Sequence, residues 1–167
     1  QRREAVPLAR LTALAQRAVQ RLRLNGRGQL TFNFIDSPTM RALNRRFIGH
    51  HRLTPPLSSG KGRTWRSVNE FLRVEAQSRR LHGQKKGAGL TDVLSFRYPR
   101  ESVVGEILIA PAAARRYANA HRVSYEDELA RYVVHGLLHW CGHEDRTPAQ
   151  QRKMRQLEDQ LLVKCAD

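Results

Sequence analysis

The sequence predicts an α+β fold, in which helices pack on a mixed sheet of about four strands. Three observations lead to this prediction. Apolar residues recur with helical spacing near both ends of the chain, strand-like segments lie between them, and two of these segments are joined by a short turn. A length of 167 residues corresponds to a single domain, residues 1–167.

The first three predicted elements are a helix, a strand and a second helix. Residues 6–24 repeat apolar side chains every three or four positions, which predicts an amphipathic helix. Residues 29–35 alternate Leu and Phe with polar residues, the pattern of a half-buried strand. Ser37 is then expected to cap a second helix, with Pro38 in its first turn.

The composition changes between residues 54 and 90. Pro55 and Pro56 open this stretch, Gly87 and Gly89 close it, and it holds eight Lys/Arg against two Asp/Glu. Proline and glycine at these positions disfavour regular structure. We therefore predict that residues 54–90 form a basic, mobile insertion within the domain.

The second half of the chain predicts two strands followed by three helices. The strand segments are rich in β-branched and aromatic residues, and Ser124-Tyr-Glu-Asp127 resembles a capping box that starts a helix. Gly142 is expected to end that helix. The predicted elements are strands over residues 93–98 and 103–109, and helices over residues 111–119, from Ser124 to Cys141, and from Thr147 onwards.

Positive charge is concentrated in the first part of the chain. The formal net charge is +15; residues 1–90 hold nineteen Lys/Arg and four Asp/Glu, whereas residues 91–167 hold eleven of each. Such a one-sided charge suits a polyanion, because each cation that neutralises a phosphate releases counterions. We therefore expect a nucleic-acid partner. An anionic membrane surface, or the arginine-rich usage of a GC-rich genome, is the alternative explanation.

Composition disfavours membrane-spanning and secreted proteins. Hydrophobic residues make up 40% of the chain, but no apolar run approaches the roughly 20 residues that a spanning helix needs. Two cysteines, Cys141 and Cys165, and the lack of a charged-then-apolar leader indicate neither a disulfide framework nor secretion. We expect a soluble, cytoplasmic protein.

Histidines and acidic residues cluster at the end of one predicted helix. His135 and His139 are four residues apart, so both imidazoles lie on one helix face and can bind one metal ion. Gly142 can turn the chain back, so that His143 or Asp145 supplies a third ligand. Three protein ligands on a helix and the turn after it leave a fourth position for water, as in catalytic zinc sites. A buried, hydrogen-bonded histidine pair is the alternative.

Several motifs together resemble a known family. They are His135-Gly-Leu-Leu-His139-x-x-Gly142, Thr91-Asp-Val-Leu-Ser-Phe96, Gly105-Glu-Ile-Leu-Ile109 and the last helix with Glu158. In this order, from about residue 29 to residue 162, they resemble the YbeY family of metal-dependent endoribonucleases. The resemblance implies the α+β fold, one Zn²⁺ per chain, and cleavage of single-stranded RNA. It also implies that the protein acts on the small ribosomal subunit, in maturation of the rRNA 3′ end and in ribosome quality control.

The sequence departs from the family pattern at two positions. The third histidine of the family is replaced here by Asp145, whose carboxylate binds zinc at a similar distance. Asp145 is therefore the preferred third ligand, and His143 is the alternative. A functional arginine of the family falls on Ile48. Three arginines near it in the sequence are candidates to replace it: Arg45, Arg46 and Arg52.

Other residues are candidates for proton transfer, ligand support and RNA binding. Glu144, beside Asp145, could transfer a proton, or it is an ordinary exposed acid. Asp92 could hydrogen-bond a ligand histidine, or it caps a turn. The RNA-binding residues expected in the insertion are Arg63, Trp65, Arg66, Lys85 and Lys86.

Two other functions fit parts of the sequence. Zinc peptidases with the His-Glu-x-x-His motif carry a glutamate after the first histidine, and Gly136 at that position disfavours a peptidase. Ile48 stands where the family has its functional arginine, and this departure favours a non-catalytic ribosome-assembly factor that is stabilised by its metal ion. A zinc-dependent endoribonuclease is the leading hypothesis.

Overall fold

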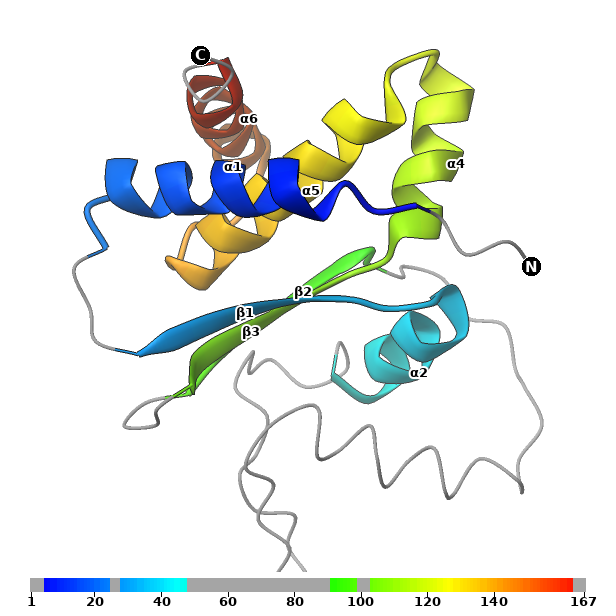
Figure 1. Cartoon of the computed structure of the whole chain (residues 1–167), viewed down its shortest axis with the longest axis horizontal. Coiled ribbons are helices and arrows are strands. Elements are labelled where there is room, and N and C mark those ends of the chain that lie inside the picture. Colours follow the sequence, from blue (N-terminus) through cyan, green and yellow to red (C-terminus); the bar gives the residue numbers. More distant parts are fainter. Residues whose placement is uncertain (1–4, 25–27, 48–90, 99–102, 164–167) are drawn as a thin grey trace, which may run out of the picture.

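The computed structural model describes residues 5–24, 28–47, 91–98 and 103–163. Helices α1, α5 and α6 lie on one side of a sheet, α2 lies on the other, and α4 packs beside α5 (Figure 1). In chain order the elements are α1 (Leu8–Arg21), β1 (Gln29–Phe34), α2 (Ser37–Phe47), β2 (Val93–Arg97), β3 (Val103–Ile109), α4 (Pro111–His121), α5 (Tyr125–Trp140) and α6 (Pro148–Val163). The predicted α+β class is confirmed.

The described part of the sheet has three strands, in the order β1-β3-β2. β1 runs parallel to β3 and β2 runs antiparallel to it, so the sheet is mixed, as predicted. The fourth strand that the sequence analysis expected is not found among the described residues. Ile107, Leu108 and Ile109 of the central strand β3 are all fully buried. Because successive side chains point to opposite faces, both faces of the sheet are covered.

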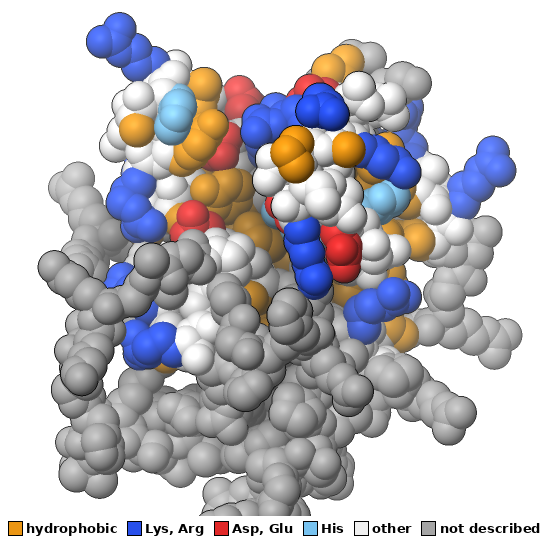
Figure 2. Space-filling model, turned by 180° about the vertical axis from the view of Figure 1, so that it is seen from behind, with side chains coloured by type: hydrophobic (Ala, Val, Ile, Leu, Met, Phe, Trp, Pro, Cys, Tyr) orange, Lys and Arg blue, Asp and Glu red, His pale blue; other side chains and the backbone are white. Residues whose placement is uncertain are grey.

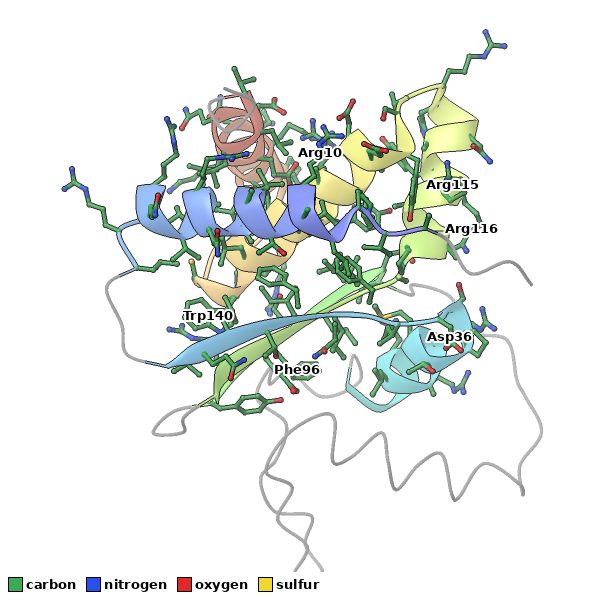
Figure 3. The ribbon with its side chains drawn as sticks, in the orientation of Figure 1. Arg10, Asp36, Phe96, Arg115, Arg116 and Trp140 are labelled. Atoms are coloured by element: carbon green, nitrogen blue, oxygen red, sulfur yellow. The ribbon has the colours of Figure 1, made fainter. Side chains whose placement is uncertain are left out.

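Two hydrophobic clusters form the core, one on each face of the sheet. Ile107 and Ile109 belong to the larger cluster, which includes residues of α1, α5 and α6. Leu108 belongs to the smaller cluster, which includes residues of α2. Figure 3 shows Trp140 on the α5 side of the sheet and Phe96 on the α2 side. The helix with the histidines is therefore anchored in the larger core.

α5 lies close against the sheet at Gly136. A Cβ atom added there would lie 2.5 Å from Cγ2 of Ile107 and 2.9 Å from Cγ1 of Val93, closer than such atoms can pack. The hydroxyl of Ser95 donates a hydrogen bond to the Gly136 carbonyl at 2.8 Å. The absence of a side chain at Gly136 thus sets the height of α5 above the sheet, and with it the position of the neighbouring His135.

Both ends of α5 agree with the sequence prediction. At its start, the Ser124 hydroxyl accepts a hydrogen bond from the backbone amide of Asp127 at 3.4 Å. At its end, Gly142 has φ +95°, a left-handed conformation that favours glycine. The amide of His143 then donates to a carbonyl of the last turn at 3.0 Å. This reversal brings Asp145 back toward the helix.

The cap of α2 differs from the prediction. The backbone amide of Thr39 donates to Oδ1 of Asp36 at 2.8 Å, so Asp36 caps the helix rather than Ser37. Since α2 begins at Ser37, the residue before it occupies the position whose side chain reaches the third amide of the helix. Asp36 is labelled at this end of α2 in Figure 3.

The predicted insertion, residues 54–90, lies outside the described residues, as do Arg52 and the five RNA-binding residues assigned to the insertion. Its mobility and the single-domain organisation stay predictions. Within the described ranges, none of the helices combines the length and the hydropathy required to span a membrane.

Candidate metal centre

Two residues of α5 and one residue of the following turn form a cluster of metal-binding side chains. They are His135, His139 and Asp145, whose ligand atoms all lie within 4.8 Å of one another. The Nε2 atoms of the two histidines are 3.0 Å apart. The Asp145 carboxylate lies 3.9 Å from Nε2 of His135 and 3.7 Å from Nε2 of His139. All three side chains are half-buried, so the cluster is held by the protein and still reachable from solvent.

The other ring nitrogen of each histidine has a hydrogen-bond acceptor. Nδ1 of His135 is 2.8 Å from Oε1 of Glu158, and Nδ1 of His139 is 2.9 Å from the carbonyl oxygen of His143. A neutral imidazole carries one proton, and both acceptors require it on Nδ1. Both Nε2 atoms then present lone pairs to one another. Two lone pairs at 3.0 Å repel, and a cation between them removes that repulsion.

The surroundings of His139 favour its neutral form. Burial lowers the pKa of His139, and the neighbouring His135 lowers it further. Desolvation disfavours the charged imidazolium, and a second positive ring nearby disfavours it again. The Nε2 lone pair of His139 is therefore available to a metal ion at neutral pH.

Glu158 supports His135 from α6. Its side chain is only 6% exposed, and its second oxygen, Oε2, accepts a hydrogen bond from Arg131 at 2.9 Å. Burial alone would raise the pKa of this carboxyl, but the hydrogen bonds from His135 and Arg131 outweigh burial and lower the pKa. An ionised carboxylate that accepts the Nδ1 proton of a ligand histidine is a recurrent feature of metal sites, because it fixes the ring and its tautomer.

The donor atoms fit a divalent metal ion. Two donor atoms each about 2.0–2.1 Å from a tetrahedral zinc ion lie about 3.4 Å apart. The two Nε2 atoms are 3.0 Å apart, and Asp145 approaches His135 with Oδ2 at 3.9 Å and His139 with Oδ1 at 3.7 Å, so the donor atoms lie within a few tenths of an ångström of that spacing. Two imidazole nitrogens and one carboxylate oxygen suit Zn²⁺ and other divalent transition metals. Three protein ligands and partial exposure leave room for water or substrate, the arrangement of catalytic sites.

The two candidates for the third ligand lie differently with respect to the cluster. Asp145 belongs to the cluster together with both histidines. His143 contributes its backbone carbonyl, which accepts from His139, and its ring is not part of the cluster. The sequence analysis ranks Asp145 before His143, and this choice of third ligand stays a prediction.

The remaining predicted site residues are not members of the cluster or have side chains that the structure does not describe. The Glu144 carboxylate is exposed and lies 3.6 Å from Arg146. The Asp92 carboxylate lies 3.9 Å from Arg116 on α4, and burial raises the pKa of Asp92. Arg45 is exposed on α2, and the side chain of Arg46 is not described.

Sequence reasoning assigned no role to Glu158 as the partner of His135. A signal was present, because Glu158 lies between Met154 and Leu161 on the apolar face of the last helix. A carboxylate on a buried face needs a partner. The identity of that partner depends on how α6 packs against α5, which the sequence pattern does not show.

Comparison with known proteins identifies relatives. The model of the family described as "Endoribonuclease YbeY" matches residues 67–166. A protein of Flavobacterium psychrophilum named Endoribonuclease YbeY is 40% identical over 74 residues, which cover 44% of this chain and 53% of the relative. A protein of the same name from Myxococcus xanthus is 29% identical over 159 residues, which cover 91% of this chain and 41% of the relative.

A third relative of that name, from Endomicrobium trichonymphae, is 32% identical over 99 residues, which cover 59% of this chain and 70% of the relative. The chain spans about half the length of most of the curated relatives it matches. The family-model match includes the whole of α5 and the turn with Asp145, and so all three residues of the cluster.

Proposed function

The chain belongs to the YbeY family, and from this premise we propose that it is an endoribonuclease that cleaves single-stranded RNA with one metal ion. The ligands of that ion are His135, His139 and Asp145, and the ion is zinc. The observation that carries the proposal is the 3.0 Å separation of the two Nε2 atoms beside the Asp145 carboxylate. With both ring protons on Nδ1, each Nε2 atom presents a lone pair there, and a cation relieves their repulsion.

Each ligand has a separate task in this site. His135 and His139 hold the ion through Nε2, and their Nδ1 protons stay with Glu158 and with a backbone carbonyl. Asp145 offsets one unit of the positive charge. A zinc ion bound there supplies Lewis acidity toward water and toward a phosphate oxygen of the RNA backbone.

Further residues complete the proposal. Glu144, next to Asp145 and exposed to solvent, is the proposed proton carrier. Asp92 is given no hydrogen bond to a ligand histidine, because its carboxylate lies near Arg116 and Nδ1 of each histidine already faces another acceptor. The positive charge that binds the phosphate group at the cleavage point is proposed to come from Arg45, Arg46 and Arg52. The RNA on either side of the cleavage point is proposed to bind five residues of the insertion: Arg63, Trp65, Arg66, Lys85 and Lys86.

The proposed substrate is ribosomal RNA. The excess of Lys and Arg before residue 91 suits a long polyanion, and the relatives are named as endoribonucleases. We propose that the chain acts in the cytoplasm on the small ribosomal subunit, in maturation of the rRNA 3′ end and in ribosome quality control.

A peptidase is disfavoured by packing as well as by sequence. A glutamate general base would have to stand at Gly136, where even a Cβ atom would collide with Ile107. The competing function is a non-catalytic assembly factor that binds RNA and uses the metal ion for stability. Both the nuclease and the assembly factor require the metal ion, so RNA cleavage distinguishes them.

The test compares metal content and RNA cleavage in three proteins. Elemental analysis of the purified full chain is expected to find about one zinc ion per chain. Wild type is expected to cut a labelled single-stranded rRNA fragment, and His139→Ala to lose both zinc and cleavage. His121→Ala is the matched control, because this histidine lies on α4 with its Nδ1 2.9 Å from the carbonyl of Tyr117.

The outcomes separate the functions. Cleavage by wild type and His121→Ala but not by His139→Ala supports the nuclease. Zinc binding with no cleavage by any of the three proteins supports the assembly factor. Absence of metal after reconstitution with Zn²⁺ contradicts both.

A further inference from the structure

Arg131 is connected to the proposed metal centre through Glu158. It lies on α5 one turn before His135, so its side chain projects on the same face of the helix as the histidines. Its Nη1 atom donates to Oε2 of Glu158 at 2.9 Å and to Oδ1 of Asp159 at 3.0 Å. The other oxygen of Glu158 accepts from Nδ1 of His135 at 2.8 Å. The Glu158 carboxylate is thus held at both oxygens.

Both hydrogen bonds of the Glu158 carboxylate are shielded from solvent. The side chain of Glu158 is 6% exposed and that of Arg131 is 28% exposed, so little water is available to replace either hydrogen bond. Without Arg131, Oε2 would be a charged oxygen with no donor in a poorly solvated place, which is costly. The carboxylate would then turn toward other donors or toward solvent, and Oε1 would leave its position at His135.

We infer that Arg131 is a positioning residue of the metal centre: it fixes the Glu158 carboxylate, which in turn keeps the proton of His135 on Nδ1 and its Nε2 directed at the metal ion. This inference rests on the proposed function, since it assumes that the cluster binds a metal ion. Arg131 touches neither the ion nor the RNA, and it acts only through Glu158.

An interhelical tie without any role in metal binding is the alternative, and the chain contains a matched example of one. Arg10 on α1 contacts two consecutive acids of another helix, Glu126 at 2.7 Å and Asp127 at 2.6 Å. These acids lie in the first turn of α5, at the end opposite His139. Arg10 is 50% exposed. Arg10→Gln therefore removes the same kind of contact from a place remote from the metal ligands.

The test measures Zn²⁺ affinity rather than stability alone. Arg131 also lies near the buried Glu128, so its removal is expected to lower the melting temperature of the metal-free protein, whatever its role. We would titrate Zn²⁺ into the full chain in competition with a chromophoric chelator. Wild type, Arg131→Gln, Arg131→Lys and Arg10→Gln would be compared, and the absorption spectrum of bound Co²⁺ would report ligand geometry in each.

Arg131→Gln is expected to bind Zn²⁺ about tenfold more weakly than wild type, the lower end of the effect of changing groups that support metal ligands. Its Co²⁺ spectrum should differ from that of wild type. Arg131→Lys should recover part of the affinity, because both hydrogen bonds come from a single nitrogen, Nη1, which an ammonium group can replace. Arg10→Gln should match wild type in affinity and spectrum.

Two results would overturn the inference, and they are distinguishable. Equal Zn²⁺ affinity and identical Co²⁺ spectra in wild type, Arg131→Gln and Arg10→Gln would show that Arg131 only ties α5 to α6, and the proposed metal function would stand. Failure of wild type itself to bind Zn²⁺ would remove the metal function and this inference together. If Arg131→Gln does not fold, Arg131→Met supplies the same comparison, because it keeps most of the aliphatic stem and removes both hydrogen bonds.

Discussion

At Gly136 the backbone of α5 lies so close to the sheet that a Cβ atom would meet Ile107 at 2.5 Å and Val93 at 2.9 Å. Both neighbours are buried side chains of the sheet, with little room to move. Gly136→Ala is therefore expected to lower the free energy of unfolding by about 1–3 kcal/mol, the usual cost of overpacking. Urea denaturation of the metal-free protein would measure this change.

The control for Gly136 is Gly142, which lies just after the C-terminal end of the same helix. Nothing lies within 4 Å of a Cβ atom added at Gly142, whose φ of +95° is in the left-handed region. Asn tolerates that region better than other residues with a side chain. Gly142→Asn is expected to cost less than Gly136→Ala; the reverse order would contradict the packing argument.

The choice of the third metal ligand gives a prediction about two neighbouring residues. The Asp145 carboxylate belongs to the ligand cluster, whereas His143 faces it with its backbone carbonyl. Asp145→Ala is expected to weaken Zn²⁺ binding by more than about 100-fold, beyond the 10–100-fold typical of residues that only support ligands. His143→Ala should change it little, because the carbonyl remains.

Competition titration with Zn²⁺ on the two single variants measures both effects. If His143→Ala were the variant that loses zinc, the turn after α5 would have to rearrange on metal binding, and Asp145 would not be the ligand. Asp145→His should retain zinc, since imidazole and carboxylate bind it at similar distances.

At the scale of single elements, the start of α2 shows how sensitive a helix cap is to one residue of register. The carboxylate of Asp36 accepts the Thr39 amide at 2.8 Å, and Ser37 is already the first residue of the helix. Asp36→Ala is expected to lower the free energy of unfolding by about 1 kcal/mol. Ser37→Ala should be close to neutral, and thermal unfolding of the two variants would measure the difference. A larger loss of stability in Ser37→Ala than in Asp36→Ala would show that Ser37 caps the helix, as the sequence analysis expected.

Helix α5 and the cluster at its end could be predicted because the relevant signals are local. The spacing of His135 and His139 and the glycine at 142 all lie within eight residues, and each acts through helix geometry alone. The contact of His135 with Glu158 joins residues 23 apart, on two helices whose packing no local pattern specifies. The parallel pairing of β1 with β3 is also non-local, since it joins Gln29 to Val103.

At the scale of the whole molecule, the charge of the chain is divided between two regions. Residues 1–90 carry the whole positive excess, and residues 91–167 carry none. On the face that Figure 2 shows, Lys and Arg side chains of the described residues are interspersed with Asp and Glu. This division is consistent with a metal site that needs acidic groups and a separate region that attracts RNA.

The charge division predicts where RNA affinity should depend on salt. Lys85→Gln with Lys86→Gln removes two charges from the predicted insertion, and Arg152→Gln with Lys153→Gln removes two exposed charges from α6. For single-stranded RNA, the logarithm of the binding constant falls with the logarithm of salt concentration by about 0.7 for each phosphate neutralised. The first double variant should reduce this slope by about 0.7 for each phosphate that the two lysines no longer neutralise, and the second should leave it unchanged. Fluorescence anisotropy of a labelled rRNA fragment at several salt concentrations gives both slopes. An equal reduction of the salt slope in the two double variants would mean that RNA affinity depends on the net charge of the protein alone. The insertion would then have no specific role in binding RNA.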